Sequence, residues 1–119
     1  VPLVGPNSMI MALMASGFNG QNFCFNGYLP VKNGEREAKI RQLENKVYKE
    51  NQTQIFIETP YRNQKLLESL TKTLRPETKI CIASSITTKD ERIITKNCTQ
   101  WKKDKIQLEK VPSIFLIYK

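Results

Sequence analysis

The chain has 119 residues, with 19 Lys and Arg against 11 Asp and Glu, no His and three Cys. This length predicts one domain with a buried core, and the net charge of +8 favours polyanionic partners such as nucleic acid. The absence of His excludes imidazole catalysis and His metal ligands, and three widely spaced Cys without a CxxC motif argue against a disulfide framework or a zinc site. We therefore expect a reducing, cytoplasmic location.

The beginning of the chain differs in composition from the rest, because the first 31 residues carry no charged side chain. Within them, residues 9–15 form an apolar run that is too short to cross a bilayer, which takes about 20 residues, so no membrane contact is predicted. Asn7 or Ser8 is expected to cap a first helix, and Gly17 to end it in a left-handed conformation. We expect this uncharged stretch to be covered by protein on several sides.

Strands and helices are predicted to alternate after it. Residues 23–25 read as a short strand followed by a turn at Asn26-Gly27, and residues 35–50 as an amphipathic helix with Ile40, Leu43 and Val47 on its inner side. Further strands are expected at 53–58, 79–83, 92–95 and 113–118, a helix from Thr59-Pro60 to residue 74, and a short helix at 101–105 in which Trp101 packs on the sheet.

This order predicts an α/β fold in which a mixed sheet of about five strands is flanked by helices. The sequence has no GxGxxG fingerprint and no P-loop. It does place Pro or Gly next to small polar residues at several junctions of predicted elements, and open sheets bind ligands at such strand ends. The junctions are residues 5–8, 25–30, 57–62 and 111–113.

Three segments carry a family resemblance. The Pro2-Leu3-Val4-Gly5-Pro6 turn with the helix Ala12–Phe18, the segment Phe25–Lys32 and the segment Ile55–Arg62 resemble, in order, PLPGP with AL-x-ASGL, F-x-GFLP-x-K and IFYESPHR. These motifs belong to the tetrapyrrole (corrin and porphyrin) methylase family, in its branch of ribosomal RNA ribose 2′-O-methyltransferases. The resemblance weakens after the third segment, since an ARELTK motif of that branch corresponds here to Ala83–Thr88, with Ser84 and Ser85 in place of Arg and Glu.

The resemblance implies that residues 1–119 form the C-terminal domain of an S-adenosylmethionine-dependent methyltransferase, with an N-terminal domain preceding Val1. The cofactor would lie in the cleft between the two domains. The positions expected to touch it, many through backbone groups, are Ser8, Met9, Glu58, Ile86 and Pro112.

By the same resemblance we expect a homodimer, an acceptor that is either a ribosomal RNA ribose or a tetrapyrrole, and an inactive chain when the N-terminal domain is missing. The residues do not assign a catalytic base. The alternative is a non-catalytic RNA-binding or interaction module that uses the basic cluster Lys102, Lys103 and Lys105.

Overall fold

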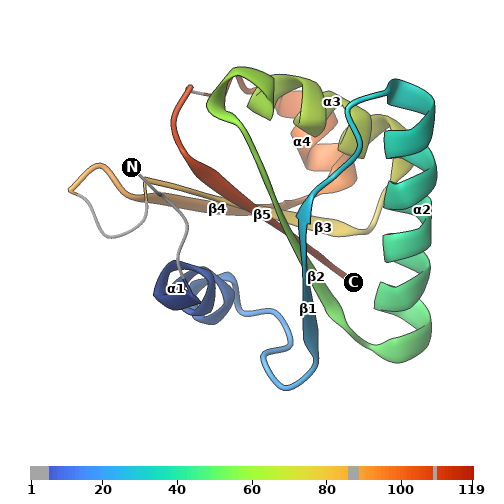
Figure 1. The fold of residues 1–119 in the computed structure, drawn as a ribbon, viewed down its shortest axis with the longest axis horizontal. Coiled ribbons are helices and arrows are strands. Elements are labelled where there is room, and N and C mark those ends of the chain that lie inside the picture. Colours follow the sequence, from blue (N-terminus) through green and yellow to red (C-terminus); the bar gives the residue numbers. More distant parts are fainter. Residues whose placement is uncertain (1–5, 86–88, 109) are drawn as a thin grey trace.

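The computed structural model describes residues 6–85, 89–108 and 110–119, with side chains from residue 10 onward in these ranges. It confirms the α/β prediction, since the fold is a five-stranded mixed sheet flanked by helices (Figure 1). The elements are α1 (Pro6–Ser16), β1 (Phe23–Tyr28), α2 (Asn33–Glu50), β2 (Thr53–Glu58), the 3₁₀ turn η1 (Pro60–Arg62), α3 (Asn63–Thr73), β3 (Lys79–Ser84), β4 (Arg92–Asn97), α4 (Cys98–Asp104) and β5 (Ser113–Tyr118).

The sheet has the strand order β1-β2-β5-β3-β4. β1 is parallel to β2, whereas β5 is antiparallel to both of its neighbours, β2 and β3. β1, β2 and β3 therefore run in one direction and end at the same edge of the sheet, where β5 begins. We call this the strand-end edge and define it by Tyr28, Glu58, Ser84 and Ser113.

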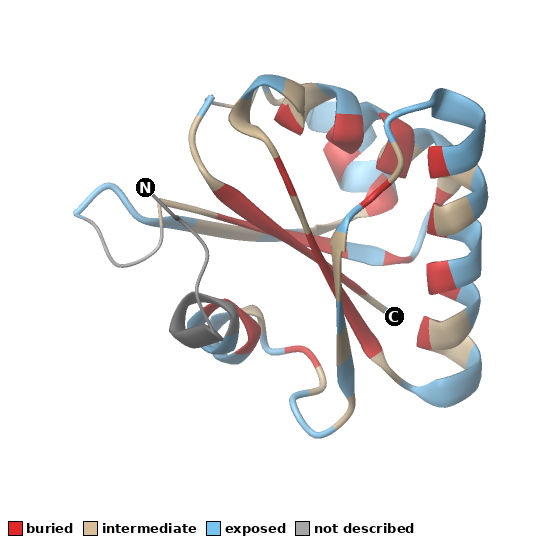
Figure 2. Ribbon diagram, viewed as in Figure 1, coloured by how far each residue is buried: buried red, intermediate tan, exposed pale blue. Residues whose placement is uncertain are grey.

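One face of the sheet, the closed face, is covered by α2, α3 and α4 (Figures 1 and 2). The predicted helix stripes point into it: Leu66, Leu67 and Leu70 of α3 are buried, and Phe56 of β2 stacks on Phe115 of β5 at a centroid distance of 6.0 Å. Apolar burial of this kind is the main stabilising contribution to the fold. The buried members are Leu29, Ile40, Leu43, Val47, Phe56, Leu66, Leu67, Leu70, Leu74, Ile80, Ile82, Cys98, Trp101, Phe115 and Ile117.

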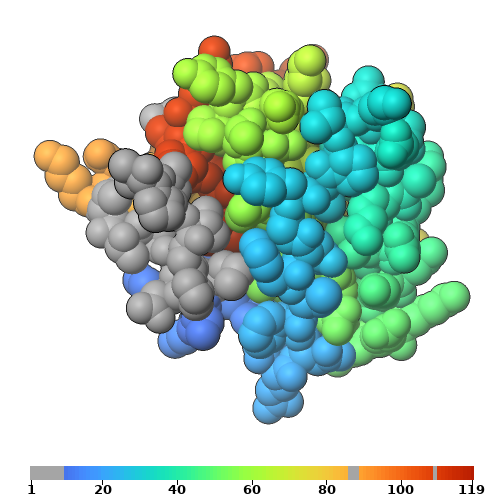
Figure 3. Space-filling view, viewed as in Figure 1, coloured from blue at the N-terminus to red at the C-terminus, as the bar shows by residue number. Residues whose placement is uncertain are grey.

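The opposite face, the open face, carries α1 as its only helix among the residues that the structure describes (Figure 1). Ala12 and Leu13 of α1 pack with Phe18 on a smaller buried cluster, which comprises Ala12, Leu13, Phe18, Ile55, Cys81, Ala83, Ile114 and Leu116. Beside α1, Phe23 and Phe25 of β1 remain exposed, and Figure 3 shows the blue to cyan segment around β1 at the molecular surface. The open face is thus only partly covered.

Two charged side chains of α2 are buried on the closed face. Glu44 of α2 accepts hydrogen bonds from the backbone N–H of Arg75 (2.8 Å) and from the hydroxyl of Thr78 (2.7 Å), which ties α2 to the loop before β3. Arg36, at the start of α2, donates from Nε to the Ser69 hydroxyl (3.0 Å) and from Nη1 to the Val31 carbonyl (2.9 Å). Such hydrogen bonds offset the cost of burying a charge.

Two local predictions are wrong. α1 already includes Pro6, so Asn7 and Ser8 lie inside the helix and do not cap it, although Gly17 follows it with the expected positive φ of 76°. Asn26 and Gly27 do not form a turn: β1 continues through both residues with a bulge in its register with β2. The Asn26 amide restores part of the interrupted ladder by donating to the Ile55 carbonyl at 3.3 Å, and Gly27 supplies a φ of 67° that suits a bulge.

Candidate functional site

Small polar side chains meet at the strand-end edge. Ser84 and Ser113 are register partners on β3 and β5, and their hydroxyl oxygens are 3.0 Å apart. Ser113 donates its proton to the Val111 carbonyl (3.1 Å), so Ser84 donates to Ser113. The buried Asn63 amide, at the start of α3, donates to the same carbonyl (2.8 Å) and to the Ser113 hydroxyl (3.3 Å). The network joins three elements and fixes the geometry of the edge.

Glu58 ends β2 and is the register partner of Ser113. Its side chain is only 2% exposed, and Oε1 accepts a hydrogen bond from the Thr59 N–H (2.7 Å) while lying 4.0 Å from Nη1 of Arg62. Both contacts are made by Oε1, and the side chain is buried. A ligand at this position would therefore meet the backbone of the β2 end before it met the carboxylate.

The backbone turns sharply after β3. Ser85 has a φ of 52°, a left-handed conformation that costs a residue with a side chain about 1 kcal/mol or more, and its N–H donates to the Pro112 carbonyl at 3.1 Å. Such strain is concentrated at ligand and active sites. The hydrogen bond holds the segment that leads into residue 86 against the entry to β5.

A hollow of about 680 Å³ opens beside this edge. Ser84, Ser85 and Val111 line its mouth, and Ile82 and Trp101 are among the residues that line it deeper in. Its volume lies within the range of about 300–1,000 Å³ that is usual for small-molecule sites.

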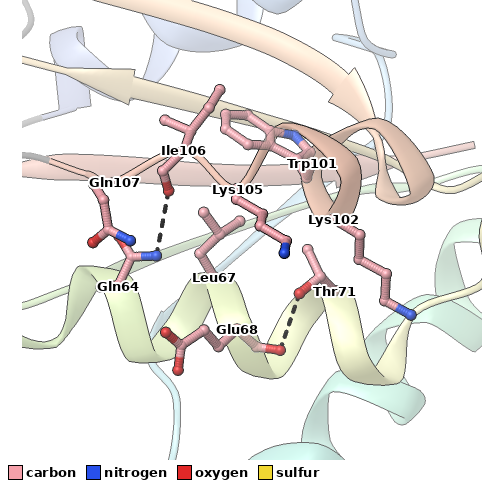
Figure 4. Close-up of a pocket in the computed structure, with 9 residues that line it drawn as sticks. All are labelled: Gln64, Leu67, Glu68, Thr71, Trp101, Lys102, Lys105, Ile106 and Gln107. Atoms are coloured by element: carbon pink, nitrogen blue, oxygen red, sulfur yellow. Dashed lines mark hydrogen bonds between the residues drawn. The ribbon is translucent and has the colours of Figure 1, made fainter.

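A second hollow, of about 300 Å³, lies between α3 and the segment after α4 (Figure 4). Gln64 spans it by donating to the Ile106 carbonyl (3.3 Å) and accepting from the Leu108 N–H (2.7 Å), while Lys102 and Lys105 stand at its rim. Trp101 lines both hollows but is 2% exposed, and its indole N–H donates to the Ile80 carbonyl at 2.9 Å. Trp101 packs on the sheet, as predicted, and offers no face to a base.

Of the five residues expected to contact a cofactor, Glu58 and Pro112 come together at the strand-end edge. Glu58 is the register partner of Ser113, which directly follows Pro112. Ile86 lies outside the described residues and follows Ser85 directly in the chain. Ser8 and Met9 belong to α1, but their side chains also lie outside the described part.

The sequence does not single out Ser84 or Asn63 as part of this site, and it marks Ser113 only as a member of the 111–113 junction. A small polar residue at a strand end was the available signal. That signal predicts a meeting of Ser84 and Ser113 only when the strand order, which places β5 next to β3, is known.

The two buried cysteines, Cys81 and Cys98, offer no nucleophile to this edge. Burial raises the pKa of the Cys81 thiol against the opposing effect of a hydrogen bond with Thr95, and burial also raises the pKa of Cys98. Both thiols therefore stay protonated and unreactive near neutral pH. Within the described ranges there is no cluster of three His, Cys, Asp or Glu that would hold a metal ion, and no helix there is long and apolar enough to span a membrane.

Solved structures share this fold. The methyltransferase CobJ superposes with a TM-score of 0.57 at 19% identity, covering 93% of this chain and 47% of its own. Uroporphyrin-III C-methyltransferase from Thermus thermophilus, solved with S-adenosylhomocysteine, has a TM-score of 0.55 at 14% identity, covering 92% and 49%. At these identities the likeness establishes the fold alone. No family model matches the chain.

Curated relatives are closer in sequence. Ribosomal RNA small subunit methyltransferase I of Pasteurella multocida is 36% identical over 104 residues, and that of Haemophilus influenzae 38% over 104 residues, each covering 85% of this chain. The chain belongs to the tetrapyrrole methylase family. It spans about a third of the length of these relatives, namely 36% and 35%, so it corresponds to one part of such a methylase.

Proposed function

We propose that this chain forms one wall of the cofactor cleft of an S-adenosylmethionine-dependent methyltransferase whose acceptor is a ribose of ribosomal RNA. The observation that carries the proposal is the strand-end edge: Glu58, Ser84 and Ser113 converge there in a chain more than a third identical to named ribosomal RNA methyltransferases. The tetrapyrrole acceptor is supported only by structures of the same fold at below 20% identity.

The edge suits the cofactor chemically. S-adenosylmethionine supplies an electrophilic methyl group on a sulfonium, so the protein has chiefly to hold donor and acceptor in line. Backbone groups around Glu58 and Pro112 and the Ser84 hydroxyl, which can still accept, provide neutral hydrogen-bonding partners for the cofactor's polar groups, while Ser113 holds Ser84 in place. Because Ser84 and Ser85 replace the Arg and Glu of the related motif, we assign this edge to orientation and not to proton transfer.

The partners that we propose follow from the open face. An upstream domain would complete the cleft and cover Ile10, Met11 and Met14 of α1, which are exposed in this chain. We also propose a homodimer and a cytoplasmic location. Three cysteines without disulfide partners and the ribosomal RNA named for the relatives support that location.

Calorimetric titration with S-adenosylmethionine tests the proposal. We expect measurable affinity in the full-length protein and little or none in residues 1–119, together with transfer of labelled methyl groups to small-subunit ribosomal RNA by the full-length protein only. Tight cofactor binding by residues 1–119, or none by the full-length protein, would contradict the divided cleft.

The alternative, a basic interaction module, has support in the exposed side chains of Lys102, Lys103 and Lys105. It predicts RNA binding without cofactor binding, and an affinity that falls steeply with salt. Charge reversal of the three lysines would then abolish the function, whereas the methyltransferase proposal expects cofactor binding to survive the change.

A further inference from the structure

The four tyrosines of the chain fall into two groups. Tyr48 and Tyr118 pack against the buried core, whereas Tyr28 and Tyr61 are 63% and 81% exposed. Tyr28 is the last residue of β1, and Tyr61 lies in η1 directly after β2. Because β1 and β2 are parallel, both strands end at the strand-end edge, and both exposed tyrosines therefore lie there. The two exposed tyrosine rings are thus found where the candidate site is.

Tyr61 stands on a well-anchored turn. The Arg62 N–H donates to the Thr59 carbonyl at 2.9 Å, and the Asn63 N–H donates to the Pro60 carbonyl, so the turn makes its own backbone hydrogen bonds. The buried Asn63 amide then binds the Val111 carbonyl from the loop before β5. A rigid aromatic side chain loses little conformational entropy when a ligand stacks on it.

One cation lies over the ring, and a second belongs to the residue that follows Tyr61 in the chain. Nζ of Lys110, on the loop held by Asn63, lies 5.8 Å from the Tyr61 ring centroid, within the range of a cation–π contact. The Arg62 side chain is partly exposed and reaches toward the buried Glu58 carboxylate. Tyr61 follows Glu58 by three positions in the chain and Lys110 precedes Pro112 by two, so the ring and the cations flank the residues proposed for the cofactor.

We infer that Tyr61, Lys110 and Arg62 form a contact for a single nucleotide of the RNA substrate beside the methyl donor. An unstacked base would lie on the free face of Tyr61, and a neighbouring phosphate would meet Lys110 and Arg62. The inference rests on the proposed function, because it requires RNA to reach this edge.

The chemistry of the three side chains favours single-stranded RNA as the occupant. Proteins recognise single-stranded RNA by stacking splayed bases on aromatic rings and by pairing phosphates with Lys and Arg. A protein partner would gain less from two cations next to a highly exposed ring in a chain of net charge +8.

The test uses the full-length protein, a fluorescein-labelled single-stranded oligoribonucleotide of ribosomal sequence, and anisotropy titrations at several salt concentrations. We expect Tyr61→Ala to weaken binding roughly 10-fold, as is usual for the loss of one stacked base, and Tyr61→Phe to stay within about twofold of the parent. Lys110→Gln should lower the slope of log affinity against log salt by about 0.7, the value for one single-strand phosphate contact.

The matched control for charge is Lys49→Gln, an exposed lysine in the last turn of α2 at the opposite edge of the sheet, which should leave the slope unchanged. Titration with S-adenosylmethionine and a melting curve accompany each variant. Weaker RNA binding in Tyr61→Ala with unchanged cofactor affinity and melting temperature supports the contact.

Three results would overturn the inference: RNA affinity of Tyr61→Ala equal to the parent, a Tyr61→Phe variant as weak as Tyr61→Ala, or a joint loss of RNA binding, cofactor binding and thermal stability that marks Tyr61 as a residue of the domain interface. A parent protein that binds no S-adenosylmethionine is a different result. It contradicts the proposed function, and the Tyr61 and Lys110 comparisons with RNA remain decisive for the contact.

Discussion

The two faces of the sheet differ in how completely the chain covers them. In the part of the chain that the structure describes, three helices and a core of fifteen buried side chains cover one face, whereas α1 and a core of eight buried side chains cover part of the other. Among the described residues, seven of the eight large exposed hydrophobics lie between residues 10 and 31, the stretch without charge. They are Ile10, Met11, Met14, Phe23, Phe25, Tyr28 and Val31. The described residues leave these side chains uncovered, and the apolar surface that they form is of the kind that contacts another domain or subunit.

The largest contrast in the free energy of unfolding is expected between a buried residue of the closed face and an exposed residue of the open face. Leu70→Ala, in the middle of the closed face, should lower the free energy of unfolding by about 2–5 kcal/mol because it leaves a cavity. Met14→Ser, at a residue 76% exposed on the open face, should change it by less than about 0.5 kcal/mol. Urea denaturation of residues 1–119 measures both, and similar values for the two variants would remove the distinction between the faces.

The substitution Phe25→Asp tests whether another domain covers the open face. Phe25 is the register partner of Ile55, a member of the open-face core, and its ring is exposed. The substitution should scarcely affect residues 1–119 but should destabilise the full-length protein by about 1–3 kcal/mol, because an unpaired charge would be buried under the proposed upstream domain. Thermal denaturation of both proteins gives the comparison. Equal effects in the two would show that nothing docks on Phe25.

A smaller effect is expected at the helix that completes the closed face. The Asn97 side chain accepts from the Gln100 N–H at 2.8 Å while the Gln100 side chain accepts from the Asn97 N–H at 3.0 Å, a capping box at the start of α4. Asn97→Ala should cost about 1 kcal/mol by urea denaturation, and Asn97→Asp, which retains the acceptor, much less. A loss of the same size in both variants would assign the effect to something other than the cap.

The last prediction concerns pH. Burial raises the pKa of the Cys81 thiol in the open-face core and of the Cys98 thiol in the closed-face core. The folded state therefore keeps both thiols protonated at a pH where the unfolded chain releases them, so their contribution to stability is intact below the ordinary thiol pKa of about 8.5 and declines above it. The slope is at most about 1.4 kcal/mol per pH unit for each thiol. Denaturation at pH 7.5 and 9.5 tests this, with Cys98→Ala expected to flatten the decline.

The fold followed largely from local sequence. Strand 53–58, strand 113–118 and the leucine stripe of α3 were predicted with their correct bounds or faces. The two strands are short apolar runs next to Pro60 or Pro112, and the leucines of α3 follow a helical period that stops before Pro76. The bulge at Asn26-Gly27 was not predicted, since the same dipeptide favours a hairpin turn when no parallel neighbour is known. Only the pairing with β2 distinguishes the two.

The candidate site depended on information that the sequence does not display. Glu58 and Pro112 were selected through a family resemblance, and their proximity follows from the insertion of β5 beside β2. The burial of Arg36 and Glu44 was not anticipated, because charged residues on an amphipathic helix normally face solvent. Their neutral hydrogen-bonding partners come from elements far away in the chain.

The place of β5 at the centre of the sheet also constrains biosynthesis. β2 and β3 have no shared partner until Ser113–Tyr118 have been translated, so the β1–β2 pair and the β3–β4 hairpin emerge from the ribosome as two halves with open edges. Unpaired strand edges are prone to aggregation. Nascent chains stalled before residue 113 should therefore depend on chaperones, and those that extend past residue 118 should become resistant to protease in one step.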